Sequence, residues 1–148
     1  MDAQQAGARL ELRFPAQAGE LRGMREALRE RLRAWRLDEA CATDVVMAVD
    51  EACQNVIRHA YRGDPDGVIE LEVRRAEDEL QIAVRDFAPS VDPTRIRPRP
   101  LEELRPGGLG THLIRSAMDH TEYCKPLSGP GNLLRMVKKL ASSGACGT

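Results

Sequence analysis

The chain has 148 residues, enough for a single domain with its own hydrophobic core. Acidic and basic residues nearly balance, leaving a formal net charge of -1, so the overall charge does not attract nucleic acid or anionic lipid. No apolar run approaches the roughly 20 residues that span a bilayer, and the first residues lack the basic and then apolar order of a signal peptide. We therefore expect a cytoplasmic protein that binds neither nucleic acid directly nor a membrane.

A strand and two helices are predicted in the N-terminal part of the chain. Apolar and charged residues alternate over residues 10–14, which is the period of a half-buried strand. Over residues 21–35 the apolar positions recur every three or four residues, as in an amphipathic helix. Asp38 is placed to cap a second and longer helix over residues 39–61, and Gly63 follows the end of this helix.

A β-hairpin and a long irregular segment follow. Period-two alternation over residues 69–73 and 80–84 predicts two strands joined by a short connection. Prolines at positions 89, 93, 98, 100 and 106 exclude a helix or a central strand from residues 86–110. The remaining elements are predicted as a helix over residues 110–120 and strands over residues 121–125 and 132–140.

The order of these elements predicts an α+β fold. Hairpins dominate and parallel crossovers are few, which favours a two-layer α/β sandwich with helices on one face of a mostly antiparallel sheet. We expect one domain over residues 1–148, with its core at about 8–140 and a frayed tail at 141–148.

The four cysteines, Cys41, Cys53, Cys124 and Cys146, show no CxxC spacing. Cys41 and Cys53 would lie about 18 Å apart on one helix, which is too far for a disulfide bond. A reducing cytosol is the simplest interpretation. Neither the cysteines nor His120 has the spacing of a zinc site.

The long helix carries polar side chains opposite its apolar stripe. With about 100° of rotation per residue, Glu51, Asn55, Arg58 and Arg62 gather on one face. The Glu51 carboxylate can accept a proton from an attacking hydroxyl or water, and the Asn55 amide oxygen can bind a hard cation such as Mg²⁺. The alternative is a solvated face held by local hydrogen bonds.

Two further segments carry related chemistry. Asp86 closes the second hairpin strand, where a carboxylate can accept a hydrogen bond from an exocyclic amine such as that of adenine, or can cap a turn. Gly107, Gly108 and Gly110 lead directly into a helix, whose free N–H groups and dipole attract phosphate. The alternative for these glycines is a flexible start of the helix.

The segments "DEACQNVIRHAY", "RDFAPSVDP" and "GGLGTHLIRSAMD" occur in this order along the chain. Together they resemble the three nucleotide-binding boxes of the GHKL superfamily, and most of all those of the bacterial anti-sigma factor serine/threonine kinases. The resemblance implies a Bergerat-type ATP-binding fold, with ATP and Mg²⁺ as cofactors and residues 89–107 as a lid over the nucleotide. It also implies a homodimeric regulator of transcription in the stress response, which binds a sigma factor or a STAS-type anti-anti-sigma protein and phosphorylates that small antagonist.

The resemblance also implies roles for single residues. Glu51 matches the catalytic base, and Asn55 matches the residue that binds both nucleotide and Mg²⁺. Asp86 matches the carboxylate that reads the adenine amino group. The other nucleotide-binding residues that the boxes imply are Arg58, His59, Ala88, Gly107, Gly108, Leu109, Gly110, Thr111 and His112. For His112, capping of its own helix is the alternative role.

Three positions depart from the family pattern. The first glycine box commonly reads Asp-x-Gly-x-Gly, but Ala88 and Ser90 stand at the glycine positions. A threonine near the last strand usually supports the adenine site, and Leu133 stands where we expect it. These changes support an alternative function, in which the chain sequesters a protein partner with weak or no nucleotide turnover. Simple ATP hydrolysis is a third hypothesis.

Overall fold

The computed structural model describes residues 8–89 and 109–140. The elements in chain order are β1 (Arg9–Pro15), the 3-10 helix η1 (Ala18–Glu20), α2 (Leu21–Ala34), α3 (Glu39–Asn55), the π-helix η2 (Val56–Ala60), β2 (Val68–Arg75), β3 (Glu79–Asp86), α4 (Leu109–Ala117), β4 (His120–Cys124) and β5 (Asn132–Lys139). The predicted order of strands and helices is confirmed. The predicted tail at 141–148, and the predicted lid at 89–107 apart from Pro89, lie outside the described residues.

The strands form one five-stranded sheet in the order β1-β2-β3-β5-β4. Every neighbouring pair is antiparallel, which agrees with the expected mostly antiparallel sheet. The predicted hairpin is the β2–β3 pair, in which Leu71 lies opposite Val84. Strand β5 returns beside β3, so that Asn132 at the start of β5 lies opposite Asp86 at the end of β3.

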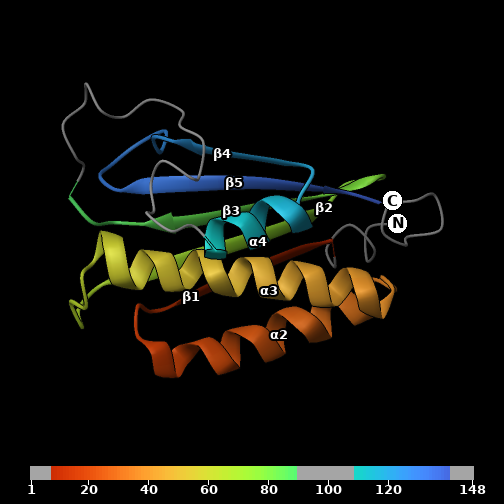
Figure 1. Ribbon diagram of the computed structural model, residues 1–148, viewed down its shortest axis with the longest axis horizontal. Helices are drawn as coiled ribbons and strands as arrows, with labels where there is room; N and C mark the ends of the chain where they lie inside the picture. Colours follow the sequence, from red (N-terminus) through yellow and green to blue (C-terminus); the bar gives the residue numbers. More distant parts are fainter. Residues whose placement is uncertain (1–7, 90–108, 141–148) are drawn as a thin grey trace.

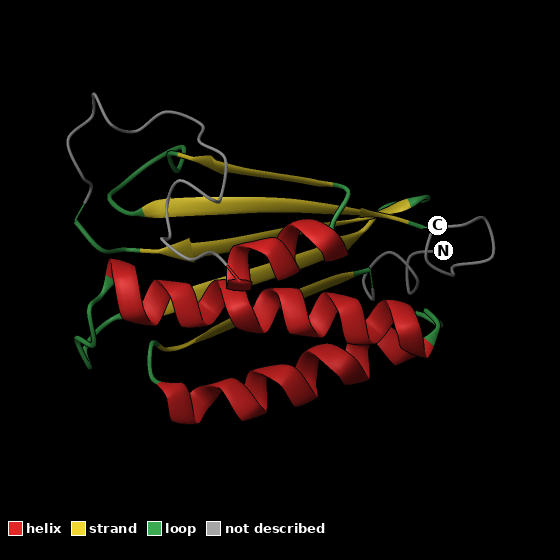
Figure 2. Ribbon diagram, viewed as in Figure 1, coloured by secondary structure: helices red, strands yellow, loops and turns green. Residues whose placement is uncertain are grey.

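The helices cover one face of the sheet, and Figure 2 shows the helical layer and the strand layer side by side. Burial alternates along the strands as this arrangement requires. Ile69, Leu71 and Val73 of β2 are buried under the helices, whereas Glu70 and Glu72 between them lie on the open face. The predicted two-layer sandwich is therefore confirmed.

The hydrophobic core lies between the helices and the sheet. Leu28 and Leu32 of α2, Val45 and Val49 of α3, and Ile114 of α4 are fully buried in it. Each of these side chains contributes about 1.5–3 kcal/mol through burial, and together they hold the helices against the sheet. The apolar spacing that predicts α2 and the long helix is the spacing that faces this core.

The long helix begins as predicted and ends in a different geometry. The Asp38 side chain caps it by accepting a hydrogen bond from the backbone N–H of Cys41 at 2.7 Å. Its last turn, Val56–Ala60, is a π-helix, in which the N–H of Tyr61 bonds the carbonyl of Val56 at 3.0 Å. Arg62 then has a positive φ of 51°, which turns the chain away from the helix axis.

The cysteine prediction is confirmed in one respect, because Cys53 and Cys124 are free and Cys53 therefore does not pair with Cys41. Cys41 itself is disulfide-bonded, which the spacing did not predict. Burial raises the pKa of the Cys53 thiol, so this buried cysteine behaves as a small apolar residue of the core. In the part of the chain that the structure describes, no helix has both the length and the apolarity needed to cross a membrane.

Candidate functional site

Three segments that the sequence analysis singled out lie toward the same end of the molecule. The C-terminal half of α3, the end of β3 and the start of α4 are grouped on the left-hand side of Figure 1. Helix α3 packs against both β3 and α4. Glu51 and Asn55 lie near the C-terminal end of α3, and Asp86 is the last residue of β3. The two helical residues and the strand-end carboxylate are thus brought to one region.

The polar face of α3 is not a simple solvated face at this point. Asn55 is only 8% exposed, and the Glu51 side chain is 14% exposed. Buried polar groups of this kind need hydrogen-bond or ionic partners, which the structure provides. Glu51 and Asn55 are therefore not freely solvated, while the local contacts that the alternative expects are present between them and Arg58.

Arg58, in the π-helix η2, is a partner of both Glu51 and Asn55. One guanidinium nitrogen, Nη2, lies 3.2 Å from Asn55 Oδ1 and 3.5 Å from Glu51 Oε2. The other nitrogen, Nη1, donates to Gln54 Oε1 at 3.3 Å. Arg62, which the helical wheel places on the same face, lies beyond the helix end, where its positive φ changes the chain direction. That part of the helical-wheel prediction is wrong.

The Asp86 carboxylate is buried, with 3% exposure of the residue. Its Oδ1 accepts hydrogen bonds from the Ala88 backbone N–H and from Asn132 Nδ2, both at 3.0 Å. Burial raises the pKa of Asp86, and the hydrogen bonds from Asn132 and Ala88 partly offset this effect. Both of these bonds go to Oδ1, and a backbone hydrogen bond from Asn132 also stabilises the charged carboxylate.

Ala88 stands where a glycine was expected, and the structure accommodates it. Its side chain is buried, and it is not among the described non-glycine residues with a positive φ, which are Arg36 and Arg62. Its N–H donates to the Asp86 carboxylate, a contact that any residue except proline can make in this conformation. The alanine therefore imposes no backbone strain on the end of β3. Ser90 lies outside the described residues.

The residue that faces Asp86 from β5 is Asn132 and not Leu133. Side chains alternate along a strand, so Leu133, opposite Arg85, lies on the open face of the sheet. Asn132, opposite Asp86, lies on the helix-covered face and donates to it. The expectation at Leu133 was wrong by one position, and strand parity relative to the buried Leu134 is the signal that would have found Asn132.

Gly131 explains how Asn132 reaches this position. Its φ is +112°, and a Cβ there would lie 1.9 Å from the backbone oxygen of Asp86. Only glycine allows the two strands to approach so closely in this conformation. Nearby, burial and the negative charge of Asp86 raise the pKa of Tyr123 to about 12.

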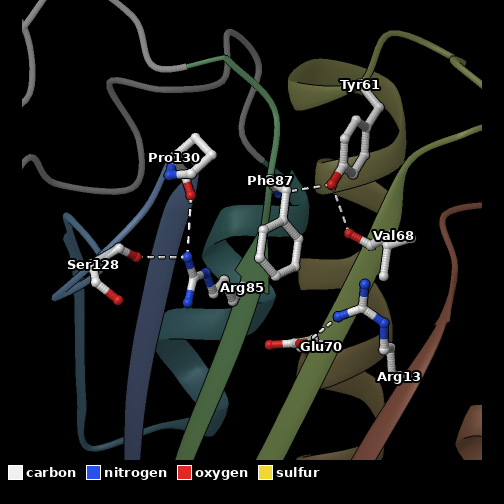
Figure 3. A network of polar contacts seen from close by, with 8 residues as sticks. All are labelled: Arg13, Tyr61, Val68, Glu70, Arg85, Phe87, Ser128 and Pro130. Carbon is white, nitrogen blue, oxygen red and sulfur yellow. Dashed lines mark hydrogen bonds and ion pairs between the residues drawn. The ribbon is translucent and has the colours of Figure 1, made fainter.

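Tyr61 joins the end of the long helix to the end of β3, and Figure 3 shows this contact. Its hydroxyl donates to the Val68 carbonyl at 2.6 Å and accepts from the Phe87 N–H at 2.7 Å. The ring lies over Gly67, where an added Cβ would come within 2.6 Å of it. Sequence reasoning missed this role, because it depends on contacts between distant segments.

Phe87 fixes the same segment from the open face of the sheet. The guanidinium groups of Arg85 and Arg13 lie 4.5 Å and 5.5 Å from its ring centroid, in cation–π contact. Arg85 Nη2 also donates to the carbonyls of Ser128 and Pro130, at 2.8 Å and 3.2 Å. The chain around Asp86 is therefore held from both faces of the sheet.

The start of α4 is described only in its backbone. The helix begins at Leu109, one residue before the predicted start. Gly107 and Gly108 lie outside the described residues, and the side chains of Leu109 and Thr111 are not described. His112 and His59 are both exposed, His112 inside α4 and His59 in the π-turn. At the far end of α4, buried Lys138 donates to the Ala117 carbonyl at 2.8 Å and fixes the helix to β5.

The oxygens of Glu51 and Asn55 are the kind of ligands that Mg²⁺ prefers. Among the described residues, no group of three or more His, Cys, Asp or Glu side chains is arranged to hold a metal ion. Mg²⁺ commonly takes only one or two protein ligands and completes its shell with phosphate and water. The pair therefore fits a Mg²⁺ ion that arrives with a nucleotide better than a cation held by protein alone.

Comparison with known proteins adds to this geometry. The family described as the histidine kinase-like ATPase domain matches residues 14–138. A relative from Halalkalibacterium halodurans named serine-protein kinase RsbW is 38% identical over 87 residues, covering 53% of this chain and 52% of the relative. A protein of the same name from Listeria innocua is 40% identical over 84 residues, covering 51% of this chain and 54% of that protein. The chain thus spans about half the length of the curated relatives that it matches.

A solved structure shares the fold. The crystal structure of the RsbU and RsbW domains of Rv1364c from Mycobacterium tuberculosis superposes with a TM-score of 0.63 at 17% sequence identity. The match covers 87% of this chain and 31% of that one. At this identity the likeness concerns the arrangement of helices and strands.

Proposed function

Because the chain belongs to the family of histidine kinase-like ATPase domains, we propose that it is an ATP-dependent protein serine/threonine kinase. In this proposal the kinase acts as an anti-sigma factor or a related switch and phosphorylates a small antagonist protein. The observation that carries the proposal is the grouping of Glu51, Asn55 and Asp86 at one end of the fold. The relatives named serine-protein kinase support serine as the acceptor.

Glu51 and Asn55 form the proposed catalytic pair. Glu51 accepts the proton of the acceptor hydroxyl, and Asn55 supplies an oxygen to Mg²⁺. When bound, Mg²⁺ supplies charge neutralisation for the transferring phosphoryl group. Burial of both side chains supports these roles, because a fixed and desolvated base is more effective than a solvated one.

Asp86 is the proposed reader of the base. Its carboxylate accepts from the adenine amino group, while the hydrogen bonds from Ala88 and Asn132 to Oδ1 keep the carboxylate in place. A guanine presents a carbonyl at the corresponding position, which would face a carboxylate without a donor between them. The contacts of Tyr61 and Phe87 support this role, since they fix the backbone on either side of Asp86.

The phosphates are proposed to lie at the start of α4. A helix N-terminus offers free N–H groups and the positive end of its dipole, and Gly107, Gly108 and Gly110 let the chain approach closely. Leu109, Thr111 and His112 belong to the same proposed wall, and Arg58 and His59 line the phosphate side from the π-turn. Residues 89–107 form the proposed lid.

The proposed partners follow from the same family relation. They are a sigma factor and a STAS-type anti-anti-sigma protein, and the chain acts as a cytoplasmic homodimer in transcription regulation and the stress response. The alternative of a sequestering module with little nucleotide turnover draws on the altered glycine box. Ala88 gives it little support, since its φ is not positive and its N–H bonds Asp86.

Substitution of Glu51 tests the proposal. Glu51→Ala should abolish phosphoryl transfer from γ-labelled ATP to candidate STAS-type proteins while calorimetry still detects Mg·ATP binding. Asp44→Ala is the matched control, because Asp44 is an exposed acidic residue of the same helix. Unchanged transfer by Glu51→Ala would remove Glu51 from the mechanism.

A further inference from the structure

One arginine nitrogen touches both oxygens of the proposed catalytic pair. Arg58 Nη2 lies 3.2 Å from Asn55 Oδ1 and 3.5 Å from Glu51 Oε2. Its positive charge therefore lies between an amide oxygen and a carboxylate. A hard cation would be drawn to the same place for the same reason.

The two oxygens and the arginine differ in burial. Glu51 and Asn55 are largely buried, whereas the Arg58 side chain is 44% exposed. The partly exposed guanidinium thus contacts two largely buried oxygens and makes a third contact, to Gln54 at 3.3 Å. All three contacts are at the long end of the hydrogen-bond range, and partly exposed ion pairs are weak. An incoming ligand can break them at a small cost.

A divalent cation and the guanidinium cannot share this position. Mg²⁺ binds oxygen ligands at about 2.0–2.1 Å. Because Arg58 Nη2 lies 3.2 Å from Asn55 Oδ1, an ion held by that oxygen would lie close to the guanidinium. Two cations at such a separation in a partly buried site repel each other strongly. Occupation by the metal would therefore favour movement of Arg58 away from Asn55.

We propose that Arg58 is a latch, meaning a side chain that holds Glu51 and Asn55 in the nucleotide-free site and leaves when a divalent cation enters with the nucleotide. The inference rests on the proposed function, because it takes Asn55 as the metal ligand. It adds a positioning role for Arg58 that differs from contact with phosphates. In the absence of metal, the guanidinium stands in for the cation beside the nucleotide.

Displacement of Arg58 by the cation predicts how strongly nucleotide affinity depends on Mg²⁺. In the wild type, Mg²⁺ replaces a positive charge that is already present, so it improves nucleotide affinity only moderately. In Arg58→Met that charge is missing without metal, and the entering ion displaces nothing. The ratio of nucleotide affinity with Mg²⁺ to affinity without it should therefore be larger in Arg58→Met. A direct contact from Arg58 to phosphate, made equally in both conditions, cancels in this ratio.

Calorimetry with the non-hydrolysable analogue AMP-PNP measures the ratio. Each protein is titrated once in excess Mg²⁺ and once in EDTA. We expect the ratio in Arg58→Met to exceed that of the wild type by about tenfold, a difference that calorimetry resolves easily. Arg58→Lys keeps the charge and should return the ratio toward the wild-type value. Arg62→Met is the matched control, because Arg62 is exposed and lies beyond the helix end.

The outcomes separate the two proposals. Equal ratios in the wild type and Arg58→Met, with nucleotide bound in both, would overturn the latch and leave the nucleotide site standing. A raised ratio in Arg62→Met as well would also overturn it, since the effect would then be one of general charge. Failure of the wild type to bind AMP-PNP in either buffer would overturn both the latch and the proposed function.

Discussion

Removal of the Tyr61 hydroxyl should weaken both the fold and the nucleotide site. This hydroxyl makes two short hydrogen bonds, to the Val68 carbonyl at 2.6 Å and from the Phe87 N–H at 2.7 Å. Each such bond contributes about 1 kcal/mol net, and an unpaired Phe87 N–H adds a desolvation cost of similar size. We therefore expect Tyr61→Phe to lower the free energy of unfolding by about 2–3 kcal/mol.

Tyr61→Phe should also affect the position of Asp86, which immediately precedes Phe87. With the Phe87 N–H unheld, the carboxylate loses part of its fixed position, and we expect Mg·ATP affinity to fall about fivefold. Urea unfolding followed by circular dichroism measures the stability, and calorimetry measures the affinity.

Tyr123→Phe is the matched control for Tyr61→Phe. These are the two tyrosines of the chain, and no hydrogen bond joins the Tyr123 hydroxyl to the residues that the structure describes. Its removal should change stability by less than about 0.5 kcal/mol. The reasoning fails if Tyr61→Phe is as stable as the wild type, or if both tyrosine variants lose the same amount.

Two further predictions concern the neighbourhood of Asp86. Because burial raises the pKa of Asp86 in the folded state, its ionisation opposes folding above that pKa, and this cost disappears below the unfolded value of about 3.9. Asp86→Asn should therefore unfold at a higher temperature than the wild type at pH 7, with the difference shrinking as the pH falls toward about 4; a constant difference would contradict this. Gly131→Ala should lower the free energy of unfolding by more than about 2 kcal/mol, since the methyl would lie 1.9 Å from the Asp86 oxygen at a φ of +112°. Gly23→Ala, in α2 with no atom within 4 Å of the added methyl, should instead stabilise by about 0.5–1 kcal/mol, and denaturant unfolding of both variants compares the two.

The elements of the fold were predictable because each has a local signal. The alternation that predicts β2 and β3 is the alternation between core and open face, and the capping role of Asp38 follows from its type and position. Asp86 was identified because it ends a clear strand pattern with a charge. Local periodicity is sufficient for such features.

The parts of the site that were missed depend on contacts between distant segments. Asn132 faces Asp86 through the pairing of β3 with β5, so strand parity gives the face of the sheet on which Asn132 lies but not its partner. Tyr61 reaches Phe87 across 26 positions of the chain. The helical wheel failed at Arg62 because it assumes a constant rotation per residue, and the π-turn and the positive φ both break that assumption.

The central claim is that the grouped side chains form an ATP site in which Asp86 reads the base. Calorimetric titration of Mg·ATP into the wild type and Asp86→Asn tests it most directly. In Asp86→Asn the asparagine oxygen can still accept from Ala88, but its NH₂ group presents a donor to the adenine amine. The account predicts binding by the wild type and a loss of at least about tenfold in Asp86→Asn, without loss of folding. No binding to the wild type at millimolar ATP, or equal binding by both proteins, would contradict it.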